Sequence, residues 1–164
     1  MKLIIFTALF ILFLPTISHS QEIENIFDDW SVFTYDMDGK KVCYMVGKPK
    51  KSSGNFKNRG EPYMMVANYG DTIEVSVSSG YLYKEKSKVF LEFLGTQSKY
   101  TMFSGERTAW ANSNEEDAEI IDKMKKASFV IIKGTSRKET TSSDKYSLKG
   151  FTKSLSEINN LCKS

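Results

Sequence analysis

The two cysteines, Cys43 and Cys162, are the residues whose chemistry is easiest to define. Cys43 lies in an apolar run typical of a β-strand. Cys162 closes an apolar face at helical spacing that comprises Phe151, Leu155, Ile158 and Cys162. Both thiols are therefore expected to point into the core. In an oxidising compartment such thiols form a structural disulfide, and the alternative is two separate buried thiols. No Cys-X-X-Cys spacing indicates a redox-active pair.

A basic stretch at residues 47–61 is the second candidate site. It contains one acidic residue, Glu61, and five basic residues: Lys48, Lys50, Lys51, Lys57 and Arg59. The stretch has no apolar periodicity, so we expect a long loop. Its charge suits an anionic partner, such as a membrane surface, a cell-wall polymer or an acidic protein. The alternative is a solvated loop whose charge keeps the protein soluble.

Catalytic and metal-binding patterns are weak. The only histidine, His19, lies in an amino-terminal segment that we expect to be removed, so Ser-His-Asp, Cys-His and the usual zinc sets are excluded. No spacing singles out a carboxylate pair among the candidates Asp71, Glu74, Glu92 and Glu106. We therefore expect no catalytic residues, no metal and no cofactor.

Two shorter motifs have structural interpretations. Ser142-X-X-Lys145 has the spacing of a Ser-Lys pair but no supporting motif. Asp36-X-Asp38-Gly39 resembles the start of a calcium loop, yet no glutamate follows at the required distance. We interpret the second motif as the turn of a β-hairpin.

The amino-terminus has the pattern of a secretory signal peptide. Lys2 precedes an unbroken apolar run over residues 3–15, and Ser18 and Ser20 fit the small positions before a cleavage site at Gln21. The run is too short to span a bilayer, which takes about 20 residues. We expect residues 1–20 to be removed, leaving an exported protein without a transmembrane span. The periplasm is the expected location, with the cell surface or secretion as alternatives.

Charge and length bound the remaining chain. The sequence has 23 basic against 20 acidic side chains, which is close to neutral and does not indicate a nucleic-acid partner. Residues 21–164 suffice for one domain with one core. No repeat or linker divides them.

The elements that must position these residues are mostly strands. Apolar or alternating runs predict strands at 30–35, 41–46, 63–69, 71–78, 88–94, 99–103, 107–111, 129–132 and 145–149. Residues 21–28 are expected to be a polar lead-in and residues 134–144 a loop. A capping pattern at Ser113 and Glu116 opens an internal helix, and a second helix covers residues 152–162. The prediction is a mainly antiparallel β-sandwich with one internal and one C-terminal helix.

Aromatic residues offer one further surface. Arg and the aromatic residues are common at interfaces, so Glu106-Arg107-X-X-Trp110 is a candidate recognition face. The tyrosines that could join it are Tyr63, Tyr69, Tyr81, Tyr83 and Tyr100. Trp110 has a competing interpretation as a core residue, which we favour.

Three stretches together resemble the invasion-associated locus B (IalB) family of alphaproteobacterial exported proteins. They are Trp30 through Cys43, then Pro49 through Tyr63, and last Lys133 through Ser136 with Asp144 through Thr152 and a closing Cys162. The matches occur in the same order as in the family and together extend over nearly the whole predicted mature chain.

The resemblance implies an immunoglobulin-like β-sandwich in which Cys43 and Cys162 are the family's cysteine pair. One departure is Lys138-Glu139, where relatives carry a glycine before the threonine, and it puts the geometry of this turn in question. The family supplies no catalytic residues. We expect a non-enzymatic binding module for an envelope protein or an anionic envelope component; alternatives are a host-contact factor and a carboxylate enzyme acting on an envelope polymer.

Overall fold

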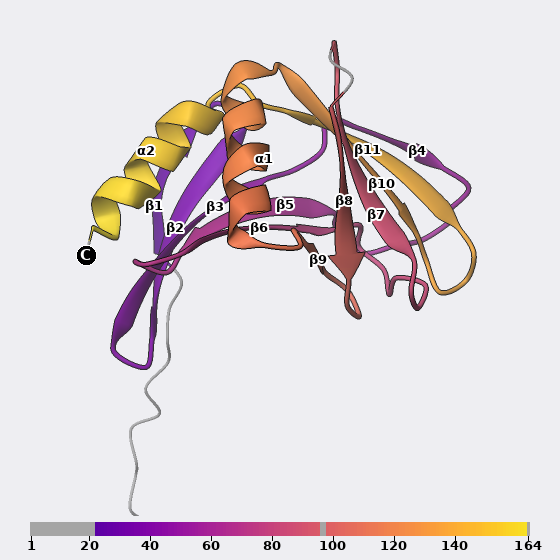
Figure 1. Cartoon of the computed structure of the whole chain (residues 1–164), viewed down its shortest axis with the longest axis horizontal. Coiled ribbons are helices and arrows are strands. Elements are labelled where there is room, and N and C mark those ends of the chain that lie inside the picture. Colours follow the sequence, from indigo (N-terminus) through magenta and orange to yellow (C-terminus); the bar gives the residue numbers. More distant parts are fainter. Residues whose placement is uncertain (1–21, 96–97, 164) are drawn as a thin grey trace, which may run out of the picture.

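The computed structural model describes residues 22–95 and 98–163, so the predicted signal peptide lies outside the described residues. The first strands are β1 (Glu22–Phe27), β2 (Trp30–Met37), β3 (Lys40–Gly47), β4 (Lys51–Gly54), β5 (Tyr63–Asn68) and β6 (Ile73–Ser78). The later elements are β7 (Lys88–Phe93), β8 (Lys99–Ser104), β9 (Ala109–Trp110), α1 (Asn114–Lys126), β10 (Phe129–Thr135), β11 (Thr141–Ser147) and α2 (Phe151–Leu161) (Figure 1).

All eleven of these strands belong to one antiparallel sheet, in the order β1-β2-β3-β5-β6-β9-β8-β7-β10-β11-β4. The two-residue strand β9 is the bridge between two halves of the sheet, because it pairs with β6 on one side and β8 on the other. Each half contains five strands. The short bridge lets the halves turn toward each other.

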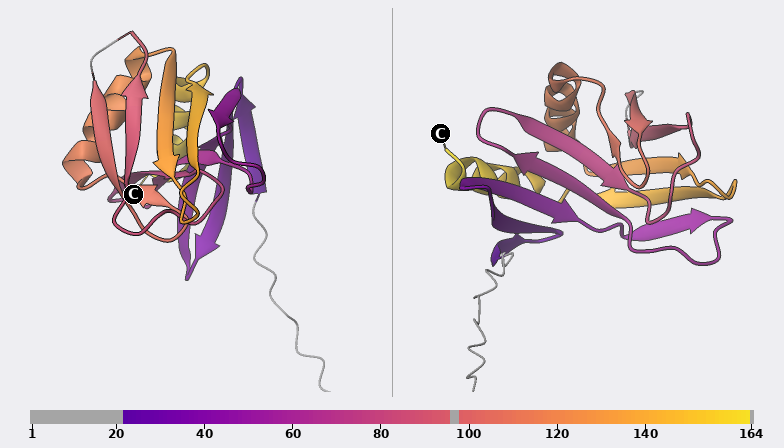
Figure 2. Two further views of the ribbon diagram at one scale, coloured as in Figure 1. Left: turned by 90° about the vertical axis from the view of Figure 1, so that its right-hand side faces the viewer. Right: turned by 90° about the horizontal axis from the view of Figure 1, so that it is seen from below.

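The connection from β3 to β4 shows how strongly the sheet bends. β4 follows β3 after a three-residue link, yet it pairs with β11 at the opposite edge of the sheet. Within that link, the Lys50 amide donates to Lys145 O at 2.8 Å. β4 and the β10–β11 hairpin therefore lie together at the end of the molecule away from α2 (Figure 2).

The two halves share one hydrophobic core, as the layers of a sandwich do. The core includes Val32, Met45 and Val66 from one half, and Leu91 and Ile132 from the other. The expected mainly antiparallel β fold with one internal and one C-terminal helix is confirmed. The two layers are joined by hydrogen bonds through β9 and form a single folded-over sheet.

Helix α1 begins where the capping pattern predicts. Ser113 Oγ accepts the Glu116 amide N–H at 3.3 Å, while the Glu116 carboxylate accepts the Asn112 amide N–H at 2.6 Å. In a capping box the glutamate carboxylate accepts the amide of the N-cap residue itself; here it accepts the amide of Asn112, the residue before the N-cap Ser113. The buried face of α1, which includes Ile120 and Met124, packs against β6.

Helix α2 packs on the first half of the sheet, against β1, β2, β3 and β5. It starts at Gly150, whose φ of 88° is the left-handed conformation that favours glycine. A Cβ here would lie 2.0 Å from Phe27 O, so the helix start sits directly against the end of β1. The predicted apolar face of α2 is confirmed, and Phe151 packs edge-on against the buried Trp30.

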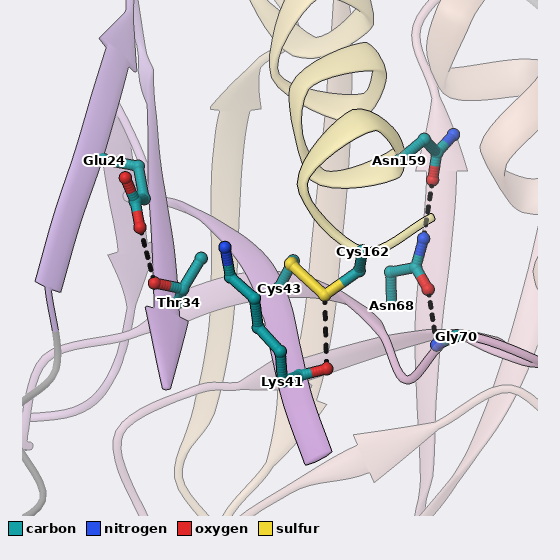
Figure 3. The surroundings of a disulfide bond; sticks show 8 residues. All are labelled: Glu24, Thr34, Lys41, Cys43, Asn68, Gly70, Asn159 and Cys162. Atoms are coloured by element: carbon teal, nitrogen blue, oxygen red, sulfur yellow. Dashed lines mark hydrogen bonds between the residues drawn. A yellow bond between two sulfur atoms is a disulfide. The ribbon is translucent and has the colours of Figure 1, made fainter. Parts of the chain in front are cut away.

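A disulfide joins Cys43 of β3 to Cys162 at the end of α2 (Figure 3). Cys162 Sγ lies 3.2 Å from Lys41 O, a contact rather than a hydrogen bond because a disulfide sulfur carries no proton. Nearby, Asn68 Nδ2 donates to Asn159 Oδ1 at 2.9 Å, which adds a second link between the sheet and α2. The disulfide fastens the last helix to the third strand, as expected.

Three expectations about irregular segments are wrong. Residues 21–28 were expected to be a lead-in, but β1 pairs with β2 over Glu22–Phe27. The expected loop at 47–61 contains β4, and most of the expected loop at 134–144 belongs to the β10–β11 hairpin. These segments lack apolar alternation, because β1 and β4 are edge strands and β11 buries polar residues, Ser142 and Asp144.

Removing the disulfide should destabilise the protein through its unfolded state. Cys43 and Cys162 are 119 residues apart, so replacing both by alanine should lower the free energy of unfolding by about 3–5 kcal/mol. Urea unfolding followed by circular dichroism measures this, and reduced wild-type protein should unfold at a midpoint close to that of the variant. Equal midpoints for oxidised and reduced wild-type protein would contradict the prediction.

Candidate functional site

The structure does not present the five predicted cations of residues 47–61 as one free surface. Lys48 pairs with Glu61 at 2.5 Å in solvent, and Lys50 pairs with Asp29. Lys51 lies in β4, and Lys57 is exposed. Arg59 is buried, so it holds the segment in place instead of contacting a partner.

Arg59 forms a two-pronged ion pair with Asp144 of β11. Nη1 donates to Oδ2 at 2.8 Å and Nη2 to Oδ1 at 2.5 Å, with side-chain exposures of only 6% and 0%. Nη1 also donates to Ser79 O at 3.0 Å, and the guanidinium lies 4.1 Å from the Phe56 ring centroid. Hydrogen bonding to Asp144 raises the pKa of Arg59. One buried cation thus joins three segments that are distant in the sequence.

A pocket of about 570 Å³ opens beside this ion pair. Its lining contains five basic residues and no acid: Lys57, Arg59, Arg107, Arg137 and Lys138. We call the exposed four, without Arg59, the basic rim. Phe56, Tyr81 and Leu82 add apolar surface to the lining. The pocket therefore combines positive charge with apolar surface.

Backbone hydrogen bonds fix the walls of the basic pocket. The Gly60 amide donates to Gly80 O at 2.8 Å, and the Arg137 amide donates to Leu82 O at 2.8 Å. Gly80 has a φ of 76°, and a Cβ there would lie 2.1 Å from Gly60 O. Only glycine permits this approach, so the segment around residue 80 can support both neighbouring walls.

The turn at residues 136–140 carries two members of the basic rim. Ser136 Oγ accepts the Lys138 and Thr140 amide N–H groups at 3.2 and 3.1 Å, which fixes the turn from inside. Glu139 takes a φ of 62°, the left-handed conformation, immediately before Thr140. A glutamate here therefore adopts a backbone conformation that favours glycine.

In the described part of the chain, no ion pair or hydrogen bond engages the side chains of the basic rim. An anion with an apolar portion suits the pocket, because the four cations attract its charge and the apolar side chains of the lining can contact its apolar portion. Sequence analysis placed Lys57 and Arg59 in the candidate site but missed Arg137 and Lys138. Arg107 was noted only as part of a recognition motif. No pattern in the sequence links these segments, since the bending of the sheet brings them together.

Three of the four candidate carboxylates lie apart from one another. Asp71, Glu74 and Glu92 line three different pockets. Glu92 is paired with Lys133 and Lys99, and Lys133 in particular lowers its pKa. Glu74 shares its pocket with a residue that sequence analysis did not consider as a site residue, Asp117 of α1.

The remaining sequence motifs have structural roles. Ser142 Oγ lies 2.7 Å from the Tyr81 hydroxyl, while Lys145 Nζ lies over the Phe129 ring, so they form no Ser-Lys pair. The Asp36 carboxylate accepts the Gly39 amide at 2.8 Å within the β2–β3 hairpin turn, as predicted.

The tyrosines do not form one recognition face, since Tyr83 is buried and Tyr69 lies with Glu74 in another pocket. Trp110 is only half-buried, in contrast to the core position favoured for it.

Within residues 22–95 and 98–163, no group of three or more His, Cys, Asp or Glu side chains is placed to hold a metal ion. Over the same residues, neither helix has the length and apolar character needed to cross a membrane.

A family model described as invasion associated locus B (IalB) protein matches residues 30–159. The chain belongs to the IalB family. The match extends from the first residue of β2 into α2 and includes the basic pocket and the pocket that contains Glu74 and Asp117. The resemblance inferred from the sequence is confirmed.

The crystal structure of invasion associated protein B from Bartonella henselae shares this fold. It aligns with a TM-score of 0.61 at 16% sequence identity, over 87% of this chain and 96% of that chain. At this identity the similarity concerns the fold alone. A search among curated proteins found no match.

Breaking the buried ion pair should destabilise the fold strongly. Asp144→Asn leaves Arg59 buried without a counter-charge and should lower the free energy of unfolding by about 3–5 kcal/mol. The double variant Arg59→Met/Asp144→Leu should recover most of the loss, because no charge remains buried. Urea unfolding measures both.

The exposed Lys48–Glu61 pair on the same segment is the matched control. The variant Lys48→Gln/Glu61→Gln should unfold at the wild-type midpoint, since solvent screens exposed pairs. A similar midpoint for Asp144→Asn and the control would show that the Arg59–Asp144 pair is not a structural anchor.

Asp117 should make stability depend on pH. Burial, and secondarily the charge of Glu74, raises its pKa from 3.8 to about 6. The native state therefore favours the protonated form of Asp117. The contribution of this preference to the free energy of unfolding is full below about pH 4 and is lost as the pH rises through about 6. Asp117→Asn keeps an acceptor for the Val75 amide but does not titrate.

The measurement is the free energy of unfolding of wild type and Asp117→Asn between pH 4 and about 7.5. The variant should gain stability relative to wild type as the pH rises toward about 6, and then the difference should level off. A constant difference across this range would show that the carboxyl group has the same pKa in the folded and unfolded states.

Proposed function

We propose that this IalB-family protein is an exported, non-enzymatic binding module of the cell envelope. Its signal peptide at residues 1–20 directs it to the periplasm, and the basic pocket holds an anionic envelope component. The observation that carries the proposal is the basic rim: four cations without acidic partners in the described structure, in a pocket that apolar side chains also line.

The pocket supports an amphipathic anion more than a purely ionic one. Phe56, Tyr81 and Leu82 contribute apolar surface beside the charges, which a phosphate or carboxylate group bearing an apolar portion would cover. A rigid frame favours binding because little order is lost when the ligand arrives. Arg59, Asp144 and the contact between Gly60 and Gly80 provide that frame.

A binding role is favoured over catalysis because the sequence candidates for catalysis do not assemble. Ser142 and Lys145 are engaged separately, and Glu92 is neutralised by two lysines. The Bartonella protein is named for invasion, but a match at 16% identity carries no such role to this chain. A host-contact role would require exposure on the cell surface, which protease treatment of intact cells tests.

Neutralising three of the four cations of the basic rim should weaken binding to anionic surfaces. The variant Lys57→Gln/Arg137→Gln/Lys138→Gln should lose about 100-fold in affinity, at about 1 kcal/mol for each cation. The probes are vesicles of phosphatidylglycerol in phosphatidylcholine, and a soluble acidic polysaccharide. Co-sedimentation and titration calorimetry at low salt measure the affinities of the protein that begins at Gln21.

The matched control removes the same charge elsewhere, as Lys40→Gln/Lys123→Gln/Lys153→Gln, three exposed positions outside the pocket. It should bind nearly as wild type does. If both triple variants lose the same affinity, only net charge matters and the pocket assignment is wrong. If wild type binds neither probe better than pure phosphatidylcholine vesicles, the proposed anionic ligand is wrong.

A further inference from the structure

A second pocket, separate from the basic one, has aromatic walls and acidic groups. It has a volume of about 630 Å³ and shares no lining residue with the basic pocket. Its aromatic side chains are Tyr69, Phe103 and Trp110. Its two carboxylates come from Glu74 of β6 and Asp117 of α1. We call it the acidic aromatic pocket.

The aromatic wall is built by strand pairing. Phe103 of β8 lies opposite Trp110 of β9, and the two rings are stacked with centroids 5.5 Å apart. Phe103 remains 50% exposed. The stacked pair therefore offers an aromatic surface to a ligand.

Neither carboxylate has a cationic partner among the described residues. Asp117 is only 5% exposed, and its Oδ1 accepts the Val75 amide at 2.7 Å. The Trp110 side chain partly offsets the effect of burial on the pKa of Glu74. Among the described residues no Lys or Arg pairs with Glu74 or Asp117, and none lines the pocket, whereas Glu92 and Asp144 both have cationic partners.

The pairing of Glu74 and Asp117 in one pocket is electrostatically unfavourable. Burial raises the pKa of both Glu74 and Asp117, so each loses solvation without gaining a counter-charge. A cationic ligand would supply the missing charge. A metal ion suits the pocket poorly, because no third acidic group joins these two carboxylates in the described chain. A neutral sugar would form hydrogen bonds but leave the charge uncompensated.

We propose that the acidic aromatic pocket binds an organic ammonium group, held by Glu74 and Asp117 and covered by the faces of Phe103 and Trp110. Aromatic faces attract cations, most strongly at tryptophan and for desolvated groups. The carboxylates supply the opposite charge. This site is independent of the anion site proposed above and takes a ligand of opposite charge.

Choline and its neutral isostere 3,3-dimethylbutan-1-ol test the role of charge directly. Titration followed by NMR should shift the Trp110 indole N–H signal, with a dissociation constant for choline on the order of 1 mM. The isostere should bind at least about 10-fold more weakly, since it keeps the shape but lacks the cation. Trp30 is fully buried, so its indole signal is an internal reference.

Variants then assign the groups. Glu74→Gln and Asp117→Asn keep the hydrogen-bond acceptors and should each weaken choline binding about 5- to 10-fold, while Phe103→Leu should weaken it about 3-fold or more. Glu92→Gln is the matched control, because Glu92 lies in a different pocket and its loss should leave binding unchanged. Phe103 is half-exposed, so its replacement remains informative even if Asp117→Asn folds poorly.

Binding should also strengthen as the pH rises from 5 to 7, because Asp117 must be ionised to attract the cation. The charged groups that raise the pKa of Asp117 are Glu74 of β6 and Glu116 of α1. Asp117→Asn should reduce this dependence.

Equal affinity for choline and its isostere would overturn the proposal. So would a Glu74→Gln variant that binds as wild type does, or a Trp110 signal that does not respond to choline at about 100 mM. None of these outcomes bears on the basic pocket, whose probes are anionic.

Discussion

The buried ion pair between Arg59 and Asp144 is the contact on which the basic pocket depends. Its partners come from the segment after β4 and from β11, and Arg59 also reaches the backbone of Ser79. Two buried charges cost solvation, and the two-pronged geometry with a third acceptor offsets that cost. The pair fixes the position of the segment after β4 relative to β11 more than it adds net stability. It determines where Phe56 and Lys57 lie relative to the turn that carries Arg137.

The sheet must fold back on itself before that pair can form. Trp30 of β2 donates its indole N–H to Ser147 O of β11 at 3.0 Å, which joins the two halves at their far ends. Phe151 at the start of α2 packs on the same tryptophan, and Cys162 at its end is bonded to β3. The C-terminal helix is therefore held at both ends against the first half of the sheet. The folded-over sheet is the frame that keeps both pockets in shape.

Elements with their own periodicity were predictable from the sequence. The apolar face of α2, the cap of α1 at Ser113 and the alternation of Val75 and Val77 each need only local information. The prediction placed the last strand at residues 145–149 and began it too late, because polar residues, Ser142 and Asp144, occupy the buried face of β11. Their burial makes sense only with Tyr81 and Arg59 as partners, which lie far away in the sequence. The same limit applies to the sites: Glu74 and Asp117 meet only when α1 packs on β6, and Lys57 and Arg137 meet only after the sheet has bent.

The near-neutral overall charge conceals a separation of charge on the surface. The basic rim and the carboxylates of the acidic aromatic pocket lie in different pockets, yet one short segment serves both. The turn between β8 and β9 carries Arg107 into the basic pocket, while Phe103 and Trp110 at its two ends form the aromatic wall of the other. Within this turn the Gly105 amide donates to Thr108 O at 2.9 Å, and Glu106 O accepts the Tyr83 amide at 2.8 Å. Because one hydrogen-bonded turn contributes to both pockets, the position of Arg107 and the position of the stacked aromatic pair are linked by the covalent chain itself.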